Sequence, residues 1–199
     1  MRGERIAAFL DRDGTVNEEV EILRLPDQLR LITGAGEAIR SLNDRGILTC
    51  IISNQAGVAR GLLTEQDLLP IHEKLRSELR LSRARLDAIY YCPHHPADGK
   101  APYNVVCDCR KPAIGMLRRG AEEFGIDLSR SFVVGDRIAD VQAGKAVGAT
   151  TILVLTGYGR IAADECSAAG VRPEFTAPSI VEAADFILRK IDGAYDAAT

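Results

Sequence analysis

Two acidic residues follow a short apolar run near the N-terminus: Asp11 and Asp13, within Phe9-Leu10-Asp11-Arg12-Asp13-Gly14-Thr15. Residues two apart in extended backbone point the same way, so both carboxylates can face one cleft. Gly14 permits a sharp turn that brings backbone amides close to a ligand. Asp and Gly are also common in solvated turns. The position directly after a predicted strand favours a ligand-facing pair.

A second acidic cluster, Asp136 and Asp140, follows the apolar run Phe132-Val133-Val134. Carboxylates that converge on one sheet edge repel each other unless a cation lies among them. A hard divalent ion with oxygen ligands fits such a set, and Mg²⁺ also bridges to substrate phosphate. Either acid could instead cap the helix that follows. We expect capping of Asp140 more than of Asp136.

Polar and cationic groups follow two further predicted elements. Ser53, Asn54 and Gln55 offer a hydroxyl and two amides at the end of one strand, which suits phosphoryl oxygens. Arg110 and Lys111 precede a proline at the predicted start of a helix, where backbone amides and cations favour an anion. Each group is weak evidence alone, but their shared location at strand ends predicts one site.

Cysteines are concentrated in one segment of the chain. Cys92, Cys107 and Cys109 lie within eighteen residues and accompany His94, whereas Cys50 and Cys166 stand alone. Three thiolates and one imidazole form the tetrahedral set typical of structural zinc. The alternative is three buried free cysteines. The segment is polar and lacks periodicity, so its ordering calls for an added constraint, and we expect zinc. His95 is the weaker candidate for the nitrogen ligand, and we expect His72 to be a surface or core histidine.

Apolar runs and amphipathic segments alternate along the chain, which predicts a three-layer α/β fold with a mainly parallel sheet and helices on both faces. Ligands of such sheets bind beyond the carboxyl ends of the strands, here after residues 10, 53, 91, 134 and 155. The predicted strands are Ile6–Leu10, Leu48–Ser53, Leu86–Tyr91, Ser131–Val134 and Thr151–Leu155. The predicted helices are Gly36–Arg45, Thr64–Leu81, Pro112–Phe124, Asp140–Val147 and Ser179–Ile191.

Length and composition limit the classes of protein that the chain can represent. With 199 residues, 46% of them hydrophobic and 27% charged, we expect a single globular domain over residues 1–199, with segment 92–109 inserted. The net charge of −3 and the absence of a long Lys/Arg run disfavour binding to nucleic acid. No apolar stretch is long enough to span a bilayer. The apolar run before Asp11 is too short for a signal peptide, so we expect a cytoplasmic protein without a membrane partner.

These motifs together resemble the haloacid dehalogenase (HAD) superfamily of phosphotransferases. The matching residues are Asp11-x-Asp13-Gly14-Thr15, Ser53, Lys111 and Gly135-Asp136…Asp140. The resemblance implies that Asp11 attacks phosphorus to form an aspartyl-phosphate, while Asp13 acts as acid and then as base. It also implies that Mg²⁺ lies between Asp11, the Asp13 carbonyl and Asp136, and that Ser53 and Lys111 hold the phosphoryl oxygens.

The cysteine-rich segment narrows the resemblance to the zinc-containing D-glycero-D-manno-heptose-1,7-bisphosphate phosphatases and their histidinol-phosphatase relatives, without a large cap domain. The similar segments lie within about the first 150 residues: Phe9–Asn17, Ser53–Gly61, Tyr90–Pro96, Cys107–Pro112 and Val134–Asp140. In those enzymes the 7-phosphate is removed and the 1-phosphate stays. A bisphosphate needs a second anion site, for which Arg60 and Arg110 are candidates. Asn54 is expected to orient sugar hydroxyls or the Asp11 loop.

One segment departs from the family pattern, because Glu18–Arg24 lacks the Gly-Tyr-Val sequence that often occurs there. We therefore expect a monomeric Mg²⁺-dependent sugar bisphosphate phosphatase whose anomer preference is open. The alternatives are a histidinol-phosphate phosphatase, and a zinc-stabilised binding module without catalysis. Repair of nucleic-acid 3′-phosphates is disfavoured by the acidic pI near 5.7.

Overall fold

The protein is built on one parallel β-sheet. Its structure, a computed structural model, describes residues 5–193. Six strands follow the order β3-β2-β1-β4-β5-β6, and every neighbouring pair is parallel. The strands are β1 (Ala7–Leu10), β2 (Leu48–Asn54), β3 (Ala88–Cys92), β4 (Phe132–Gly135), β5 (Thr150–Val154) and β6 (Phe175–Ala177). The parallel sheet predicted from the sequence is confirmed.

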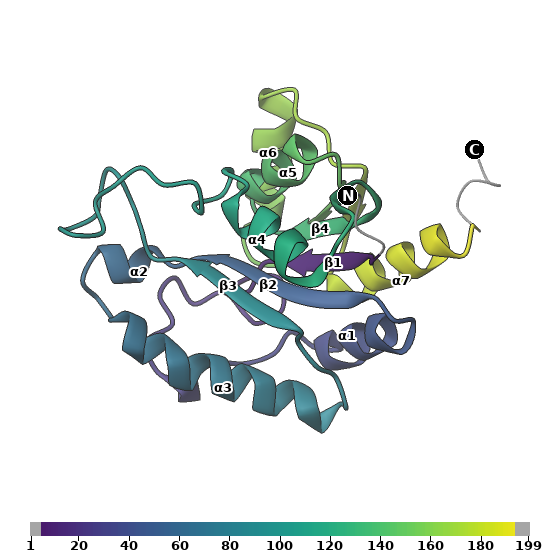
Figure 1. Cartoon of the computed structure of the whole chain (residues 1–199), viewed down its shortest axis with the longest axis horizontal. Coiled ribbons are helices and arrows are strands. Elements are labelled where there is room, and N and C mark those ends of the chain that lie inside the picture. Colours follow the sequence, from purple (N-terminus) through teal and green to yellow (C-terminus); the bar gives the residue numbers. More distant parts are fainter. Residues whose placement is uncertain (1–4, 194–199) are drawn as a thin grey trace.

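Helices cover both faces of the sheet (Figure 1). One layer holds α1 (Ala35–Asp44), α3 (Glu65–Leu81) and α7 (Ile180–Ile191), and the other holds α4 (Gly115–Phe124), α5 (Ile138–Ala146) and α6 (Gly159–Ala168). Two 3₁₀ turns, Pro26–Gln28 and Leu128–Arg130, and the short helix α2 (Ala56–Ala59) complete the elements. The three-layer arrangement is therefore also confirmed.

The central strand β1 shows why the sheet forms. Its four residues are all buried, and alternate side chains pack into different cores. Ala8 and Leu10 pack with residues of α1, α3 and α7, whereas Ala7 and Phe9 pack with residues of α4. A strand that is buried on both faces gives a continuous apolar run, as parallel sheets require. Because β1 ends at Leu10, Asp11 emerges at the carboxyl edge.

Several boundaries differ from the sequence-based prediction. Strand β6 and helix α6 were not predicted. The pattern of β6 is too short to detect because the strand has three residues, and α6 buries only Gly159, Ala162 and Cys166, which give a weak apolar stripe. Helix α4 begins at Gly115 instead of Pro112, because residues 110–113 form a turn in which Ala113 N donates to Arg110 O (2.8 Å). Helix α5 begins at Ile138 instead of Asp140.

Two helix starts agree with the cap expectations. Thr64 and Asp67 form the predicted reciprocal capping box, with Thr64 N donating to Asp67 Oδ2 (2.7 Å). Asp140 lies three residues after the cap residue Arg137, and its Oδ2 accepts from Arg137 N (3.0 Å). Asp140 therefore caps α5, as expected, although its other oxygen faces the cleft.

The longest irregular segment separates β3 from α4. Residues 93–114, all within the described part of the chain, contain no helix or strand. Residues 92–109, which include Cys92 at the end of β3, are called the cysteine loop below. The hydroxyls of Tyr91 and Tyr103 both donate to the carboxylate of Glu65 at the start of α3 (2.8 and 2.9 Å). The Tyr103 bond attaches the loop to α3, and the Tyr91 bond attaches the end of β3 to the same residue. Among residues 5–193, no helix combines the length and apolarity needed to cross a membrane.

Candidate active site and metal centre

A cleft of about 400 Å³ opens where β1 and β2 end, beside the start of α5. Parallel α/β sheets bind their ligands at this edge because helix N-termini and strand ends converge there. The residues predicted from the sequence for catalysis and for substrate binding all line this cleft: Asp11, Asp13, Ser53, Asn54, Arg60, Arg110 and Lys111. The fold brings them together from three separate segments of the chain.

Lys111 lies between the carboxylates of Asp11 and Asp140. Its Nζ is 2.8 Å from Asp11 Oδ1 and 2.6 Å from Asp140 Oδ1, and it donates to Ile52 O (2.7 Å). Burial alone would lower the pKa of Lys111, but the neighbouring carboxylates of Asp11 and Asp140 outweigh burial and raise that pKa. The lysine is therefore held as a cation directly beside Asp11.

Asp136 brings a further carboxylate to the same place. Carboxylate oxygens of Asp11, Asp136 and Asp140 lie within 4.8 Å of one another. Asp136 Oδ2 accepts from the backbone N–H of Tyr158 (2.8 Å), whereas Oδ1 is buried with no hydrogen-bond partner among the described residues. Burial, and then repulsion from Asp11, raise the pKa of Asp136 to about 8. Asp11 and Asp136 are thus close enough to share one cation.

This acidic cluster fits a hard divalent cation. The Lys111 ammonium pairs with Asp11 and Asp140, so the three buried carboxylates together carry excess negative charge, and Asp136 Oδ1 accepts no hydrogen bond among residues 5–193. Burial raises the pKa of Asp140 to about 6, although Lys111 opposes that rise. Oxygen ligands of this type are the ones that Mg²⁺ takes. The site therefore has the negative charge that a cation requires, and an Asp136 oxygen that is available to bind it.

The Asp13 carboxylate contacts hydrogen-bond donors and not the cluster of Asp11, Asp136 and Asp140. Its carboxylate accepts four hydrogen bonds: two from Arg12 (3.0 and 2.7 Å), one from Asn17 (2.9 Å) and one from Gln55 (3.0 Å). Burial alone would raise the pKa of Asp13, but the Arg12 guanidinium and the other donors lower it. Asp140, and not the side chain of Asp13, thus supplies the third carboxylate of the cluster. A metal contact through the Asp13 carbonyl stays a prediction.

Gln55 connects the end of β2 to this network. Its Oε1 accepts from Arg12 Nη2 (3.2 Å), and its Nε2 donates to Asp13 Oδ2 (3.0 Å) and to Ser53 Oγ (2.7 Å). An arginine can only donate, so the Gln55 amide orientation is fixed by Arg12. Ser53 Oγ then accepts, which leaves its own hydrogen to donate to a ligand. The sequence predicted Gln55 as an amide that suits phosphoryl oxygens, but did not predict that it links Arg12, Asp13 and Ser53.

The other predicted substrate-binding residues already have partners within the protein. Both polar atoms of the Asn54 side chain bond the backbone of Lys111 (3.0 Å each). Arg60, with 43% of its side chain exposed, lies 3.3 Å from Asp98 in the cysteine loop. Arg110 is half-buried and donates from Nη1 to His94 O (3.1 Å). Their contacts with a sugar or a second phosphate stay predictions.

The turn after β5 contributes groups that the sequence did not single out. Tyr158 N binds Asp136, and Thr156 Oγ1 donates to Gly14 O (2.6 Å), so this turn packs against the Asp11 loop. Gly157 has φ +54°, and a Cβ there would lie 2.2 Å from Asp136 Oδ2. The available signal was the Thr-Gly pair directly after the fifth predicted strand, where chemistry was expected.

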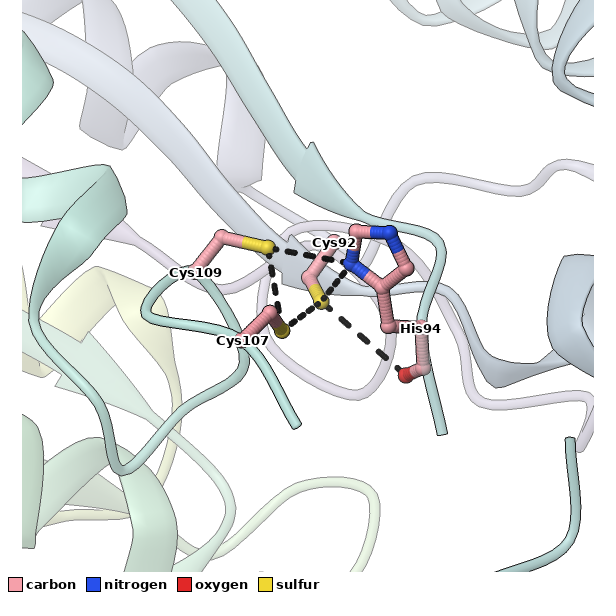
Figure 2. A group of neighbouring side chains, drawn as sticks. All are labelled: Cys92, His94, Cys107 and Cys109. Atoms are coloured by element: carbon pink, nitrogen blue, oxygen red, sulfur yellow. Dashed lines mark hydrogen bonds between the residues drawn. The ribbon is translucent and has the colours of Figure 1, made fainter. Parts of the chain in front are cut away.

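The cysteine loop forms a compact donor set (Figure 2). Sulfur atoms of Cys92 and Cys107 lie 3.5 Å apart, those of Cys107 and Cys109 lie 3.3 Å apart, and His94 Nδ1 is 3.7 and 3.5 Å from Cys92 and Cys109. A zinc–sulfur bond of 2.3 Å gives a tetrahedron with edges of about 3.8 Å. The four atoms therefore have the spacing of a tetrahedral zinc site, and all five cysteines, which lie in the described part, are free thiols.

The other two histidines have different environments. His95 Nδ1 accepts from Asp98 N (3.0 Å), so its ring is engaged away from the sulfurs. His72 is buried in α3 beside the ring of Tyr91, 5.7 Å away. Burial, and then the positive charge of Arg12, lower the pKa of His72 to about 4. His94, with Nδ1 as the facing atom, is thus the histidine of the cysteine loop that can bind metal.

The segment that departs from the family pattern borders the cleft. Glu19 and Glu21 both line it, and Glu21 has φ +56°, in the left-handed region. Glu19 pairs with Arg137 at 3.8 Å, and Arg137 lies 3.3 Å from the ring centre of Tyr158. Burial, and then repulsion from Asp13, raise the pKa of Glu19. The cleft mouth is therefore acidic on one side and cationic at Arg60 and Arg110.

Comparison with known proteins agrees with this geometry. A model of the HAD-hydrolase-like family matches residues 108–183. The D-glycero-beta-D-manno-heptose-1,7-bisphosphate 7-phosphatase of Yersinia pestis is 40% identical over 163 residues, which are 81% of this chain and 87% of that protein. The enzyme of the same name from Rhodopseudomonas palustris is 43% identical over 144 residues, 72% of this chain and 80% of that protein.

A solved structure shows the same fold. The crystal structure of the D,D-heptose 1,7-bisphosphate phosphatase from B. bronchiseptica, complexed with magnesium and phosphate, superposes with a TM-score of 0.81 at 34% identity. The match covers 93% of this chain and 99% of that one. The similarity thus extends over most of both chains. The chain belongs to the HAD-like hydrolases, in the family of the D,D-heptose 1,7-bisphosphate phosphatases.

Proposed function

We propose that this protein is a Mg²⁺-dependent phosphatase that removes the 7-phosphate of D-glycero-β-D-manno-heptose 1,7-bisphosphate and leaves the 1-phosphate. The observation that carries the proposal is the position of Asp11, 2.8 Å from the Lys111 ammonium and within 4.8 Å of Asp136. Relatives at 40% and 43% identity are named for this reaction and for the β-anomer. The reaction would supply heptose precursors of the cell envelope.

Asp11 is the nucleophile of the proposed reaction. One of its carboxylate oxygens attacks phosphorus, the phosphorus–oxygen bond to the sugar breaks, and an aspartyl-phosphate forms. A phosphate dianion repels a carboxylate, so the approach requires positive charge. Lys111 provides it at 2.8 Å from Asp11, and the hydroxyl of Ser53 is left free to donate to a phosphoryl oxygen. Water then attacks phosphorus, the phosphorus–oxygen bond to Asp11 breaks, and inorganic phosphate leaves the restored carboxylate.

The acidic cluster would hold the magnesium ion through Asp11 and Asp136, and the carbonyl of Asp13. Bound Mg²⁺ supplies positive charge to the phosphoryl oxygens and reduces their repulsion from the nucleophile. Asp136 keeps one oxygen fixed on Tyr158 N, so its other oxygen is directed toward the cluster. Asp140, which bonds both Lys111 and the start of α5, would fix the ammonium.

Asp13 is proposed to move the protons. In the first step it protonates the leaving sugar oxygen, and in the second it accepts a proton from the hydrolytic water. Four donors bind the carboxylate in the structure, which suits the second step. In the first step the proton must take the place of one of these hydrogen bonds. Arg12 and Gln55 then keep the carboxylate at the cleft while its charge changes.

The second phosphate of the substrate would bind away from the metal. Arg60 and Arg110 line the cleft, and each can grip phosphate with two parallel hydrogen bonds. Arg110 is oriented by His94 O, so the cysteine loop sets the place of this anion site. A small-molecule substrate also fits the net charge of −3. A cytoplasmic location and a monomeric state stay predictions.

We infer that Cys92, His94, Cys107 and Cys109 hold a structural zinc ion. Four donors at tetrahedral spacing leave no position for a substrate or water, which is typical of structural sites. Cys109 precedes Lys111 by two residues, and Cys92 O accepts from Gln55 N (2.8 Å). Zinc would therefore order the loop at both of its attachments to the active site, without contacting the substrate.

The test is phosphate release from three esters: the α- and β-anomers of the heptose bisphosphate, and histidinol phosphate. Magnesium-loaded wild type should have the highest kcat/KM for the β-anomer. EDTA and Asp11→Asn should each abolish the release. Asp27→Asn, which changes an exposed aspartate outside the cleft, is the matched control and should behave as wild type.

Two results would contradict the proposal. A preference of about tenfold or more for histidinol phosphate, equal to about 1.4 kcal/mol, would replace the substrate by that of the histidinol phosphatases. Equal and negligible release from all three esters, by wild type and Asp11→Asn alike, would favour a zinc-stabilised binding module.

A further inference from the structure

The side chain of Asn54 is paired with the backbone of Lys111. Asn54 Nδ2 donates to Lys111 O (3.0 Å), and Lys111 N donates to Asn54 Oδ1 (3.0 Å). A side-chain amide has one donating and one accepting edge, as a peptide group does. The pair therefore copies the bonding of a neighbouring strand. Asn54 is the last residue of β2, so the sheet is extended to Lys111 through a side chain.

Strand β2 also holds the other end of Lys111. The ammonium Nζ donates to Ile52 O (2.7 Å), two residues before Asn54 on the same strand. The backbone and the tip of the lysine are thus both attached to the end of β2. This double attachment sets Nζ at 2.8 Å from Asp11 Oδ1 and 2.6 Å from Asp140 Oδ1.

The position of Lys111 in the chain explains why such an attachment matters. It lies in residues 93–114, which form neither helix nor strand in the described chain. A lysine side chain has four torsions and loses rotamer entropy when it is fixed. The interior strand β2, paired with β1 and β3, is the rigid reference for placing that ammonium.

We propose that Asn54 is a positioning residue that acts on phosphoryl transfer through Lys111, and not a contact to the sugar. The inference rests on the proposed phosphatase function and adds to it. A positioning role has two consequences that a sugar contact lacks. Its effect is the same for substrates with and without the sugar, and it disappears when the lysine side chain is removed.

The kinetic test uses Asn54→Ala and Asn54→Asp, each alone and combined with Lys111→Ala. Substrates are the heptose bisphosphate and p-nitrophenyl phosphate, which has no sugar. Asn54→Ala should lower kcat by about 10- to 100-fold on both substrates, because a misplaced group about 1 Å from its site costs that much. KM should change by less than about threefold. In the Lys111→Ala background, Asn54→Ala should change kcat by less than about twofold.

Conservative and matched variants separate this role from a general structural one. Asn54→Asp keeps an acceptor for Lys111 N–H but loses the donor to Lys111 O, so its kcat should lie between those of wild type and Asn54→Ala. Asn104→Ala removes an exposed asparagine of the same cysteine loop and should leave kcat unchanged. Circular dichroism checks that each variant folds, and Asn54→Asp keeps the test valid if Asn54→Ala does not.

A second readout does not depend on activity. Acetic anhydride acylates accessible amines, and mass spectrometry measures the modified fraction of each lysine. Lys111, with 4% of its side chain exposed, should react far more slowly than Lys145, which is 37% exposed. Asn54→Ala should raise the labelling of Lys111 by about threefold or more, as a released ion pair gains access to water, and leave Lys145 unchanged.

The outcomes separate the two proposals. Unchanged labelling of Lys111 would overturn the positioning role, even in a protein that hydrolyses no ester. A rise in KM confined to the heptose substrate, or an effect of Asn54→Ala that persists without the lysine side chain, would do the same. Absence of phosphate release by wild type would instead overturn the proposed function, while the labelling result would still stand.

Discussion

Lys111 Nζ lies 2.8 Å from Asp11 Oδ1, with 4% of the lysine side chain and 10% of the aspartate side chain exposed. A buried ion pair of this kind is not a simple source of stability, because both charges lose their hydration. Here Asp136 and Asp140 add two more buried carboxylates. One ammonium, paired with Asp11 and Asp140, therefore does not balance three clustered carboxylates, which favours binding of a second cation.

Substitution of Lys111 by Met should affect activity and stability together. Lys111→Met keeps most of the length of the side chain but removes its charge, so kcat should fall by about 10²- to 10³-fold. The metal-free protein should lose about 3 kcal/mol of unfolding free energy, because the acids lose their partner. Phosphate release and urea unfolding measure the two effects.

The control is Lys74→Met, which removes a surface pair with Glu78 and should change stability by less than about 1 kcal/mol. A wild-type kcat in Lys111→Met would contradict the role of Lys111 in catalysis.

Gly157 should be intolerant of a side chain for a reason that concerns Asp136. A Cβ at Gly157 would lie 2.2 Å from Asp136 Oδ2, so Gly157→Ala should displace the carboxylate and weaken Mg²⁺ activation by about tenfold or more. The control is Gly170→Ala, which has a similar φ of +66° and open space within the described structure. Both variants should lose about 1 kcal/mol to backbone strain, and Gly157→Ala should lose more because its Cβ would also lie 2.6 Å from Gly14 Cα.

The measurement for this pair is the Mg²⁺ concentration that gives half-maximal phosphate release. A rise in Gly157→Ala with no rise in Gly170→Ala would agree with the expected displacement of Asp136. Equal Mg²⁺ dependence in the two variants would show that the carboxylate is not displaced.

Removal of a cysteine-loop ligand should act at a distance on the active site. We expect wild type to bind one zinc ion per chain and Cys107→Ser to bind less, because a serine hydroxyl is a poor zinc ligand. Loss of zinc should then disorder the loop that leads to Arg110 and Lys111, and kcat should fall. Mass spectrometry of the bound metal and phosphate release test both steps.

The matched variant is Cys166→Ser, at a cysteine that is buried between α5 and α6 and lies outside the loop. It should keep one zinc ion per chain and wild-type kcat. Full zinc content in Cys107→Ser would contradict the ligand assignment, and full activity after zinc loss would contradict the ordering role.

His72 should make the protein sensitive to acid. Burial, and then Arg12, lower its pKa from 6.5 to about 4, so the unfolded chain takes up a proton below pH 6.5 that the folded protein refuses until about pH 4. The free energy of unfolding should therefore fall as the pH drops through this range. From pH 7.5 to pH 5 the share of His72 is about 2 kcal/mol.

Urea unfolding of wild type and His72→Leu at both pH values measures this share. The drop in unfolding free energy between pH 7.5 and pH 5 should be smaller in His72→Leu by about 2 kcal/mol. The same drop in both proteins would show that His72 remains neutral in the unfolded chain or becomes protonated in the folded protein.

Several features of the fold followed from local patterns. The apolar runs around Phe9, Ile51 and Val133 predict strands because burial on both faces requires continuous apolar sequence. The capping box of Thr64 and Asp67 is also local, since it joins residues three apart. The three-residue strand β6 and the helix α6 escaped prediction because their apolar patterns are short or weak.

The groups that meet at the site were predictable from the sequence alone, because parallel strands bring their carboxyl ends to one edge. Asp11, Ser53 and Asp136 could be assigned to one cleft on that ground alone. The close spacing of Cys92, His94, Cys107 and Cys109 likewise follows from their types and order in a segment that lacks other means of ordering.

The partner of each side chain, in contrast, is known only from the folded structure. It directs Asn54 to the Lys111 backbone, turns Asp13 toward Arg12, and brings Asp140 beside the ammonium. It also places Gly157 against Asp136. Each of these contacts joins residues far apart in the chain or chooses among several rotamers. Strand register and the path of the loop set them, and neither is encoded in the residues on either side of a motif.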